Sequence, residues 1–324
     1  MILETGGGPG DLDIIGQIIS HPSLRVAGII VSEGVLPARE TYQQVQKLLK
    51  QTYHEGILTG VATGARAGSF HAPTARQVAE QVFKYSPEKI TWVCLDKSCS
   101  GYQSMITIPG YKDHLAKVIR GDDPERKAIF ALLNVPEKEE TKVLDSLPET
   151  PAFYREDIRP IVTESIRRYG TEEWYAGVLA SEFHHHLGVF AIIGVKMGMR
   201  AREYFGAGLD EMTIVSHAGT HPPVSCMNDG LQASTGATLG HGLITVARDS
   251  FPVPAAEFTC LGNTIRIELK PEIKTAIASA VRHLKETYGL SSDEYWDHLR
   301  DLTIEKWSTL DRHRIFTITT PEKQ

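Results

Sequence analysis

Residues 1–31, MILETGGGPGDLDIIGQIISHPSLRVAGIIV, decide the fold of the first half of the chain. The apolar run at 1–5 predicts a strand, and residues 10–22 have helical periodicity and close on Pro22. A second apolar run, LRVAGIIVS at 24–32, predicts another strand. Strand, helix and strand in this order indicate a parallel pair with a helix crossing over it.

The same alternation continues towards residue 96. We expect helices at 38–53 and 74–87, with apolar segments at 56–64 and 89–96. This order predicts an α/β N-terminal domain with a mostly parallel sheet covered by helices.

The character of the sequence changes after about residue 110, where charged residues and prolines alternate. A second body follows, with long helices expected near 160–180 and 188–205. A Gly/Ser/Thr-rich centre, a strand hairpin near 256–269 and helices near 272–288 and 292–308 complete it. The predicted organisation is an α/β domain at 1–110, a helical connector at 111–160 and an α+β domain at 161–324.

Composition narrows the classes of function. The net charge of −6 and the lack of a long basic run argue against a nucleic-acid partner. No stretch reaches the roughly 18 uninterrupted apolar residues of a membrane span. The first residues do not resemble a signal peptide, and four scattered cysteines do not form a disulfide framework. We therefore expect a cytoplasmic protein in a reducing compartment.

The glycine-rich segment ETGGGPGDLD, residues 4–13, follows the first strand and leads into the first helix. Helix-start N–H groups attract anions, so Gly6, Gly7 and Gly8 are candidate contacts to a phosphate or carboxylate of a cofactor. The segment is neither GxGxxG nor GxxxxGK[ST]. A tight strand-to-helix turn explains it equally well.

Residues 1–100 resemble the nucleoside hydrolase family, through HPSLRVAGIIVSEG (21–34) and SPEKITWVCLD (86–96). In that family, a DxDxxxDD motif at the end of the first strand holds calcium and activates water. Here Glu4 occupies the first acidic position, Gly6 and Gly10 replace two aspartates, and Asp11 remains. A hard cation needs several oxygen ligands. The resemblance therefore implies a hydrolase-like fold that has lost calcium and glycosidase chemistry.

Three consecutive histidines occur in EFHHHLGVF, residues 182–190. In a helix, residues i and i+2 point about 200° apart. Gly188 instead indicates an extended or turning segment before a helix, where His184 and His186 project to one side and His185 to the other. Imidazoles in this arrangement suit zinc, copper, iron or nickel. A solvated turn is the alternative explanation.

A second polar stretch, SHAGTHPPVSCMNDGLQASTGATLGHG at 216–242, is rich in small residues. Such a composition lets the backbone approach a ligand and supplies hydroxyl donors, here Thr235 and Thr238. It also contains a cysteine, an aspartate and three histidines: Cys226, Asp229, His217, His221 and His241. A buried cysteine beside a helix start, with histidines in loops, remains an alternative.

The two stretches FHHHLGVFAIIGVKMG (183–198) and CMNDGLQASTGATLGHG (226–242) resemble the FmdE family, named after a protein encoded beside formylmethanofuran dehydrogenase. That family has an FHxHL segment followed by a stretch of the type C..D.(I/L)Q..TG.T.G.G. The resemblance covers about residues 165–310. Gly188 and Ala237 stand where cysteines are common, His241 replaces a usual lysine, and the zinc-finger tail of some members is missing.

This resemblance implies an α+β, homodimeric domain that binds a transition metal, with His184, His186 and Cys226 as ligands. Zinc is the expected ion, and nickel, iron and copper also suit the donors. Three protein ligands leave a fourth position for water or substrate. Asp229 would orient a ligand, act as a base or cap a helix, and His217 and His241 would be acid–base groups or surface histidines.

The leading hypothesis is a metal-dependent enzyme that acts on a small organic substrate or cofactor. The alternative is a protein that binds a metal, or a metal-bearing cofactor, and delivers it to an oxidoreductase. A surviving nucleoside hydrolase is a third hypothesis, and Gly6 and Gly10 count against it.

Overall fold

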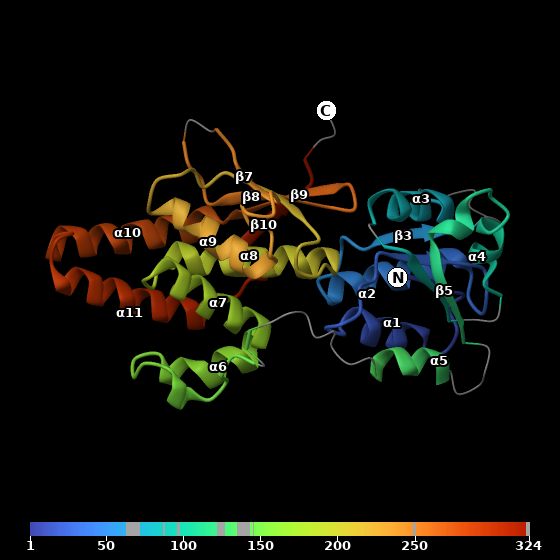
Figure 1. Ribbon diagram of the computed structural model, residues 1–324, viewed down its shortest axis with the longest axis horizontal. Helices are drawn as coiled ribbons and strands as arrows, with labels where there is room; N and C mark the ends of the chain where they lie inside the picture. Colours follow the sequence, from blue (N-terminus) through green and yellow to red (C-terminus); the bar gives the residue numbers. More distant parts are fainter. Residues whose placement is uncertain are drawn as a thin grey trace. The chain divides into compact units, whose positions relative to one another are not determined.

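The computed structural model describes residues 1–62, 72–86, 88–95, 98–121, 127–134, 143–144, 146–248 and 251–321. The chain forms two compact units (Figure 1). The first consists of Met1–Thr141, Glu203–Ala207 and Leu261–Asn263, and the second of Lys142–Arg202, Gly208–Cys260 and Thr264–Gln324.

The first unit contains a parallel sheet in the order β3-β2-β1-β4-β5. Its strands are β1 (Ile2–Thr5), β2 (Gly28–Val31), β3 (Leu58–Val61), β4 (Ile90–Cys94) and β5 (Leu115–Arg120). Its helices are α1 (Asp11–Ile19), α2 (Ala38–Gln51), α3 (Ala75–Tyr85), α4 (Ser100–Met105) and α5 (Lys127–Phe130), with 3-10 turns η1 (Tyr111–His114) and η2 (Ala131–Asn134). The predicted α/β class is confirmed.

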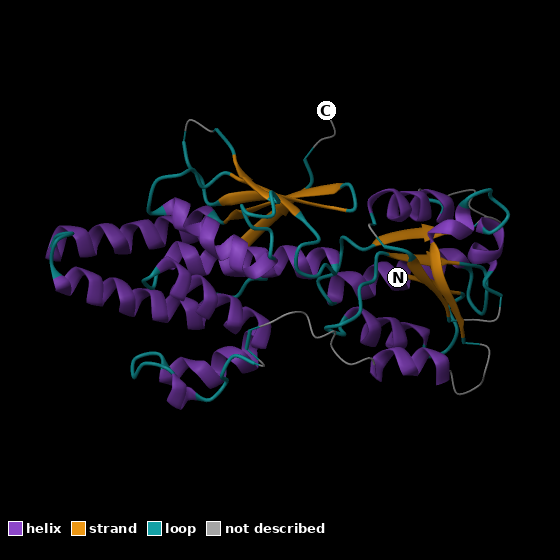
Figure 2. Cartoon of the chain, in the orientation of Figure 1, coloured by secondary structure: helices purple, strands orange, loops and turns teal. Residues whose placement is uncertain are grey.

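Both faces of this sheet are buried, as is usual for a parallel sheet. Successive residues of β1 alternate between two apolar clusters: Leu3 packs in the cluster that includes α1, and Ile2 in the cluster that includes α3. Figure 2 shows helices on the two sides of the orange strands. Because β5 pairs with β4, the first unit runs past the boundary predicted at residue 110.

The second unit is an α+β body with a mixed sheet in the order β10-β9-β8-β6-β7. Strands β6 and β7 are parallel, while β6 with β8 and β9 with β10 are antiparallel. The strands are β6 (Thr213–Ser216), β7 (Ile244–Val246), β8 (Ala255–Cys260), β9 (Asn263–Leu269) and β10 (Phe316–Thr319).

The helices of this unit are α6 (Arg159–Tyr169), α7 (Thr171–His184), α8 (Val189–Phe205), α9 (Met227–Thr235), α10 (Pro271–Tyr288) and α11 (Asp293–Thr309), with 3-10 turns η3 (Pro151–Phe153) and η4 (Val224–Cys226). The helix predicted near 160–180 is two helices, because Gly170 adopts a φ of 89° that only glycine reaches at little cost. The predicted helix at 188–205, the hairpin and the two late helices are confirmed.

Helices α8 and α9 approach each other closely enough for their backbones to touch. A Cβ built on Gly194 would lie 2.1 Å from the carbonyl oxygen of Met227, and one on Gly230 would lie 1.9 Å from that of Ala191. No larger side chain fits at either glycine without moving a helix. This contact fixes the start of α9, where Cys226 and Asp229 lie.

A buried ionic network joins α7, α8 and the segment before β10. The ammonium of Lys196 donates to Glu173 Oε1 at 2.6 Å, and Arg312 donates to Glu173 Oε2 at 2.9 Å. Lys196 has no exposed surface, and its Nζ lies 4.0 Å from the ring centroid of Tyr169. Burial lowers the pKa of Lys196, while the Glu173 carboxylate acts in the opposite direction.

Candidate metal centre

The histidine run forms the turn between α7 and α8. His184 is the last residue of α7, and His185 adopts a left-handed conformation with φ of 62° that ends the helix. The segment is therefore a tight turn and not an extended strand. The ring centroids of His184 and His186 nevertheless lie 4.2 Å apart, so the predicted approach of these two imidazoles is confirmed.

His184 is oriented by a carboxylate from another helix. Its Nδ1 donates to Asp229 Oδ2 at 2.6 Å, and its side chain is only 12% exposed. In the neutral ring, this bond leaves Nε2 without a proton. Nε2 is buried and makes no hydrogen bond to any residue that the structure describes. A carboxylate–histidine pair with the second nitrogen unpaired is the usual arrangement behind a metal-ligating imidazole.

Gly188 shows that the two Nε2 atoms face a common point. A Cβ built on Gly188 would lie 3.2 Å from Nε2 of His184 and 3.6 Å from Nε2 of His186. Burial and the neighbouring His184 lower the pKa of His186. Both effects favour the neutral imidazole, which is the form that binds a metal.

Cys226 ends η4 and precedes α9, one helical turn before Asp229. Residues three apart share a helix face, so the thiol lies on the side of α9 that reaches His184. The thiol is free and half-buried, and burial together with Asp229 raises its pKa. Within the described part of the chain, however, the ligand atoms of His184, His186 and Cys226 do not all lie within 4.8 Å of one another.

Asp229 lies inside the first turn of α9, and Cys226 occupies the N-cap position. The helix-cap explanation for Asp229 is therefore wrong, because its carboxylate bonds to His184 instead.

The other predicted acid–base groups interact with carboxylates of their own. His217 Nε2 lies 3.4 Å from Glu257 Oε1, and the exposed His241 has Nδ1 3.4 Å from Asp210 Oδ1. The structure gives no contact of either residue with the histidine pair, and their catalytic role stays a prediction.

The hydroxyls of Thr235 and Thr238 hold the turn that follows α9. Thr235 is fully buried and donates to the carbonyl of Leu231 at 2.6 Å. Thr238 accepts from the backbone N–H of His241 at 3.1 Å. Contact of these threonines with a ligand therefore stays a prediction.

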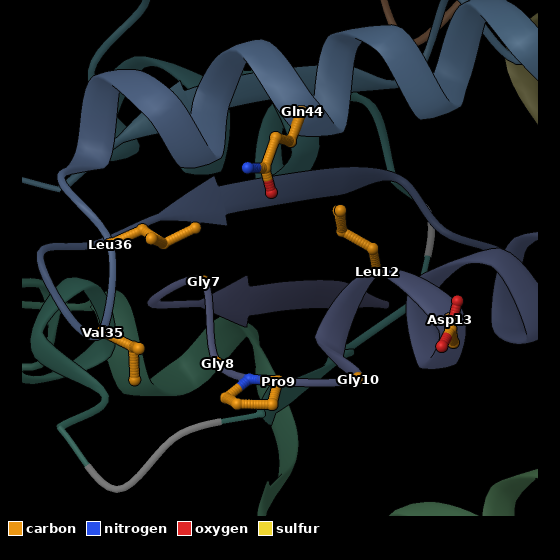
Figure 3. Close-up of a pocket in the computed structure, with 9 residues that line it drawn as sticks. All are labelled: Gly7, Gly8, Pro9, Gly10, Leu12, Asp13, Val35, Leu36 and Gln44. Atoms are coloured by element: carbon orange, nitrogen blue, oxygen red, sulfur yellow. The ribbon is translucent and has the colours of Figure 1, made fainter.

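The glycine loop of the first unit lines a shallow hollow with a volume of about 410 Å³ (Figure 3). Its lining residues are Gly7, Gly8, Pro9, Gly10, Leu12, Asp13, Val35, Leu36 and Gln44.

Two N–H groups of this loop already have acceptors within the chain. The N–H of Gly8 donates to Asp11 at 3.0 Å, and that of Gly7 donates to Thr5 at 3.1 Å. A bound phosphate would meet the Asp11 carboxylate, which argues against the anion site predicted at Gly6, Gly7 and Gly8.

A second cluster lies at the ends of β1 and β4. Glu4, Cys94 and Cys99 are buried, and their ligand atoms lie within 4.8 Å of one another. The Glu4 carboxylate accepts from Trp92 Nε1 at 3.0 Å and from the N–H of Gly101 at 2.6 Å. Cys94 and Cys99 form a disulfide with a Cα–Cα distance of 5.5 Å. The expectation of an exposed Cys99 and of four unpaired cysteines is therefore wrong.

Residues 183–317 match the family model described as FmdE, Molybdenum formylmethanofuran dehydrogenase operon. This part of the chain is an FmdE domain. The matched range begins one residue before His184 and includes His186, Cys226 and Asp229.

Among solved structures, the FmdE domain has a weak similarity to an FmdE-like protein of tungsten formylmethanofuran dehydrogenase from Syntrophus aciditrophicus. That match has 18% identity and a TM-score of 0.31, and it covers 49% of this chain and 76% of the other. No curated protein matches the sequence. The likeness of residues 1–100 to nucleoside hydrolases stays a prediction. No helix in the described part of the chain combines the length and apolar character needed to cross a membrane.

Proposed function

We propose that the FmdE domain binds a transition metal, zinc first, through His184, His186 and Cys226, and that the protein is a cytoplasmic, homodimeric enzyme acting on a small organic substrate or cofactor. One observation supports this most strongly: His184 is held by Asp229, and its buried Nε2 faces the same point as Nε2 of His186. Nickel, iron and copper are the other ions that these donors suit.

Each side chain has a distinct task in this proposal. Asp229 fixes the orientation and tautomer of His184, and His186 supplies the second nitrogen. Cys226 turns towards the pair as the third ligand, and its soft thiolate selects against magnesium and calcium. A metal held by three such ligands lowers the pKa of a bound water towards about 7 or polarises a carbonyl.

A carrier of a metal or metal-bearing cofactor is the second candidate, and the exposure of His186 favours it. A ligand on the surface can exchange its ion with a partner protein, whereas a deeply enclosed site cannot. Transfer of the bound ion to an oxidoreductase apoprotein, faster than release into buffer, would favour the carrier over the enzyme.

Elemental analysis of untagged protein tests the metal site. We expect one metal per chain in the wild type and at least tenfold weaker binding in His184→Ala, His186→Ala and Cys226→Ser. His185→Asn is the matched control, because Asn tolerates the left-handed conformation and the ring at 185 lies outside the pair. Unchanged metal content in all three ligand variants would exclude this ligand set.

A further inference from the structure

One tryptophan of the FmdE domain is half-exposed and lies against the histidine pair. Trp296, in the first turn of α11, is 48% exposed, whereas Trp92, Trp174 and Trp307 are at most 3% exposed. Its ring lies edge to face with His186, with centroids 5.9 Å apart and an interplanar angle of 79°. An indole that remains open to solvent beside a ligand pair has not been placed there for the core.

The position of this indole is fixed from below. Its neighbour Tyr295 is only 4% exposed and packs against the Trp296 ring at 5.2 Å. The Ser292 hydroxyl accepts from the N–H of Tyr295 at 3.1 Å and caps the helix. Thr303 of the same helix donates to the carbonyl of Leu187 at 3.3 Å, next to His186. The exposed part of the ring is thus presented on an ordered helix.

We propose that Trp296 is the binding surface for a flat aromatic group of an organic ligand whose oxygen donor occupies the open position of the metal. This inference rests on the proposed metal site and names the class of compound that it takes. Aromatic rings stack with centroids about 4.5–7 Å apart, so a ligand bound at the histidine pair could stack on the Trp296 ring. A ligand with the same donor head but no ring would gain nothing from the indole.

Two hydroxamates with one metal-binding head separate these terms. Benzohydroxamate carries an aromatic ring and acetohydroxamate a methyl group. Their affinities for the zinc-loaded protein are measured by titration calorimetry, after the zinc content of each variant has been determined. Trp296→Ala should weaken benzohydroxamate about fivefold or more and leave acetohydroxamate within about twofold, because only the former loses a stacking partner.

Two further variants serve as controls. Trp296→Phe keeps an aromatic face and should retain most of the preference for benzohydroxamate. Tyr288→Ala removes a ring of similar exposure, 38%, that stacks on His298 of the same hairpin, and should change neither affinity.

The outcomes separate this inference from the proposal on which it rests. Wild-type protein that binds no metal refutes the proposed site. Metal-loaded protein that binds neither hydroxamate, or for which Trp296→Ala weakens both equally or neither, overturns the role of Trp296. Loss of metal in Trp296→Ala also overturns it, because the indole would then support His186 rather than a ligand.

Discussion

Nδ1 of His184 and Oδ2 of Asp229 lie 2.6 Å apart, joining the end of α7 to the first turn of α9 across 45 positions of sequence. This bond selects the tautomer of His184 and directs Nε2 towards His186. The first prediction concerns the acceptor in this bond.

Asp229→Asn should lower metal affinity about 10- to 100-fold, because a neutral amide orients the imidazole less firmly and makes Nε2 less basic. Competition with a chromophoric chelator measures the affinity. Asp210→Asn is the control, since Asp210 faces the exposed His241 at 3.4 Å. Equal affinities for Asp229→Asn and wild type would remove Asp229 from the site.

Gly188→Ala should reduce metal binding at least tenfold without unfolding the protein. The added methyl group would lie 3.2 Å from Nε2 of His184 and 3.6 Å from Nε2 of His186, where the ion is expected. Gly240→Ala, whose Cβ meets only Thr238 Oγ1 at 3.8 Å, is the control. Metal content is determined on samples with matched melting temperatures. Full occupancy in Gly188→Ala would show that the ion lies elsewhere.

The two free cysteines should differ in reactivity. Burial, with Glu211 nearby, raises the pKa of Cys260 to about 12, so this thiol stays protonated at pH 8. Cys226 is half-buried, and its pKa is raised chiefly by burial. We expect iodoacetamide to label Cys226 at least tenfold faster, since only the thiolate reacts. Bound zinc should then protect Cys226.

Peptide mass spectrometry over time gives both alkylation rates. Labelling of Cys226 that zinc does not slow would contradict its role as a ligand, and faster labelling of Cys260 would contradict the burial argument.

Glu173→Gln should destabilise the protein by about 3–5 kcal/mol, because it leaves the buried Lys196 without its anion. Lys196→Met should cost less, about 1–2 kcal/mol, since Glu173 keeps Arg312 as a partner. Urea unfolding of the two variants measures this difference. The prediction fails if Lys196→Met is the more damaging change.

Periodicity predicted most of the fold, because apolar runs such as LRVAGIIVS and the helical face of 38–53 carry their own signal. The end of α7 was missed for a physical reason. The left-handed residue that ends a helix is usually glycine or asparagine, and His185 takes that place here. The predicted extended segment was therefore a turn, although the two rings meet as expected.

Contacts between distant helices were beyond the reach of the sequence. Spacing placed Asp229 near Cys226, but it did not show that Asp229 bonds to His184. It gave no reason to place Trp296 beside His186. The buried position of Cys99 was also missed, because it depends on how α4 packs near Glu4.

The backbone contact between α8 and α9 has a consequence for protein engineering. Because Gly194 and Gly230 bring main chain against main chain, the start of α9 keeps its place whatever atom residue 226 carries. The donor there can then be exchanged as an independent variable. Replacing sulfur with an imidazole or a carboxylate on this rigid support would shift the preference among ions along the hard–soft scale while the helices stay where they are.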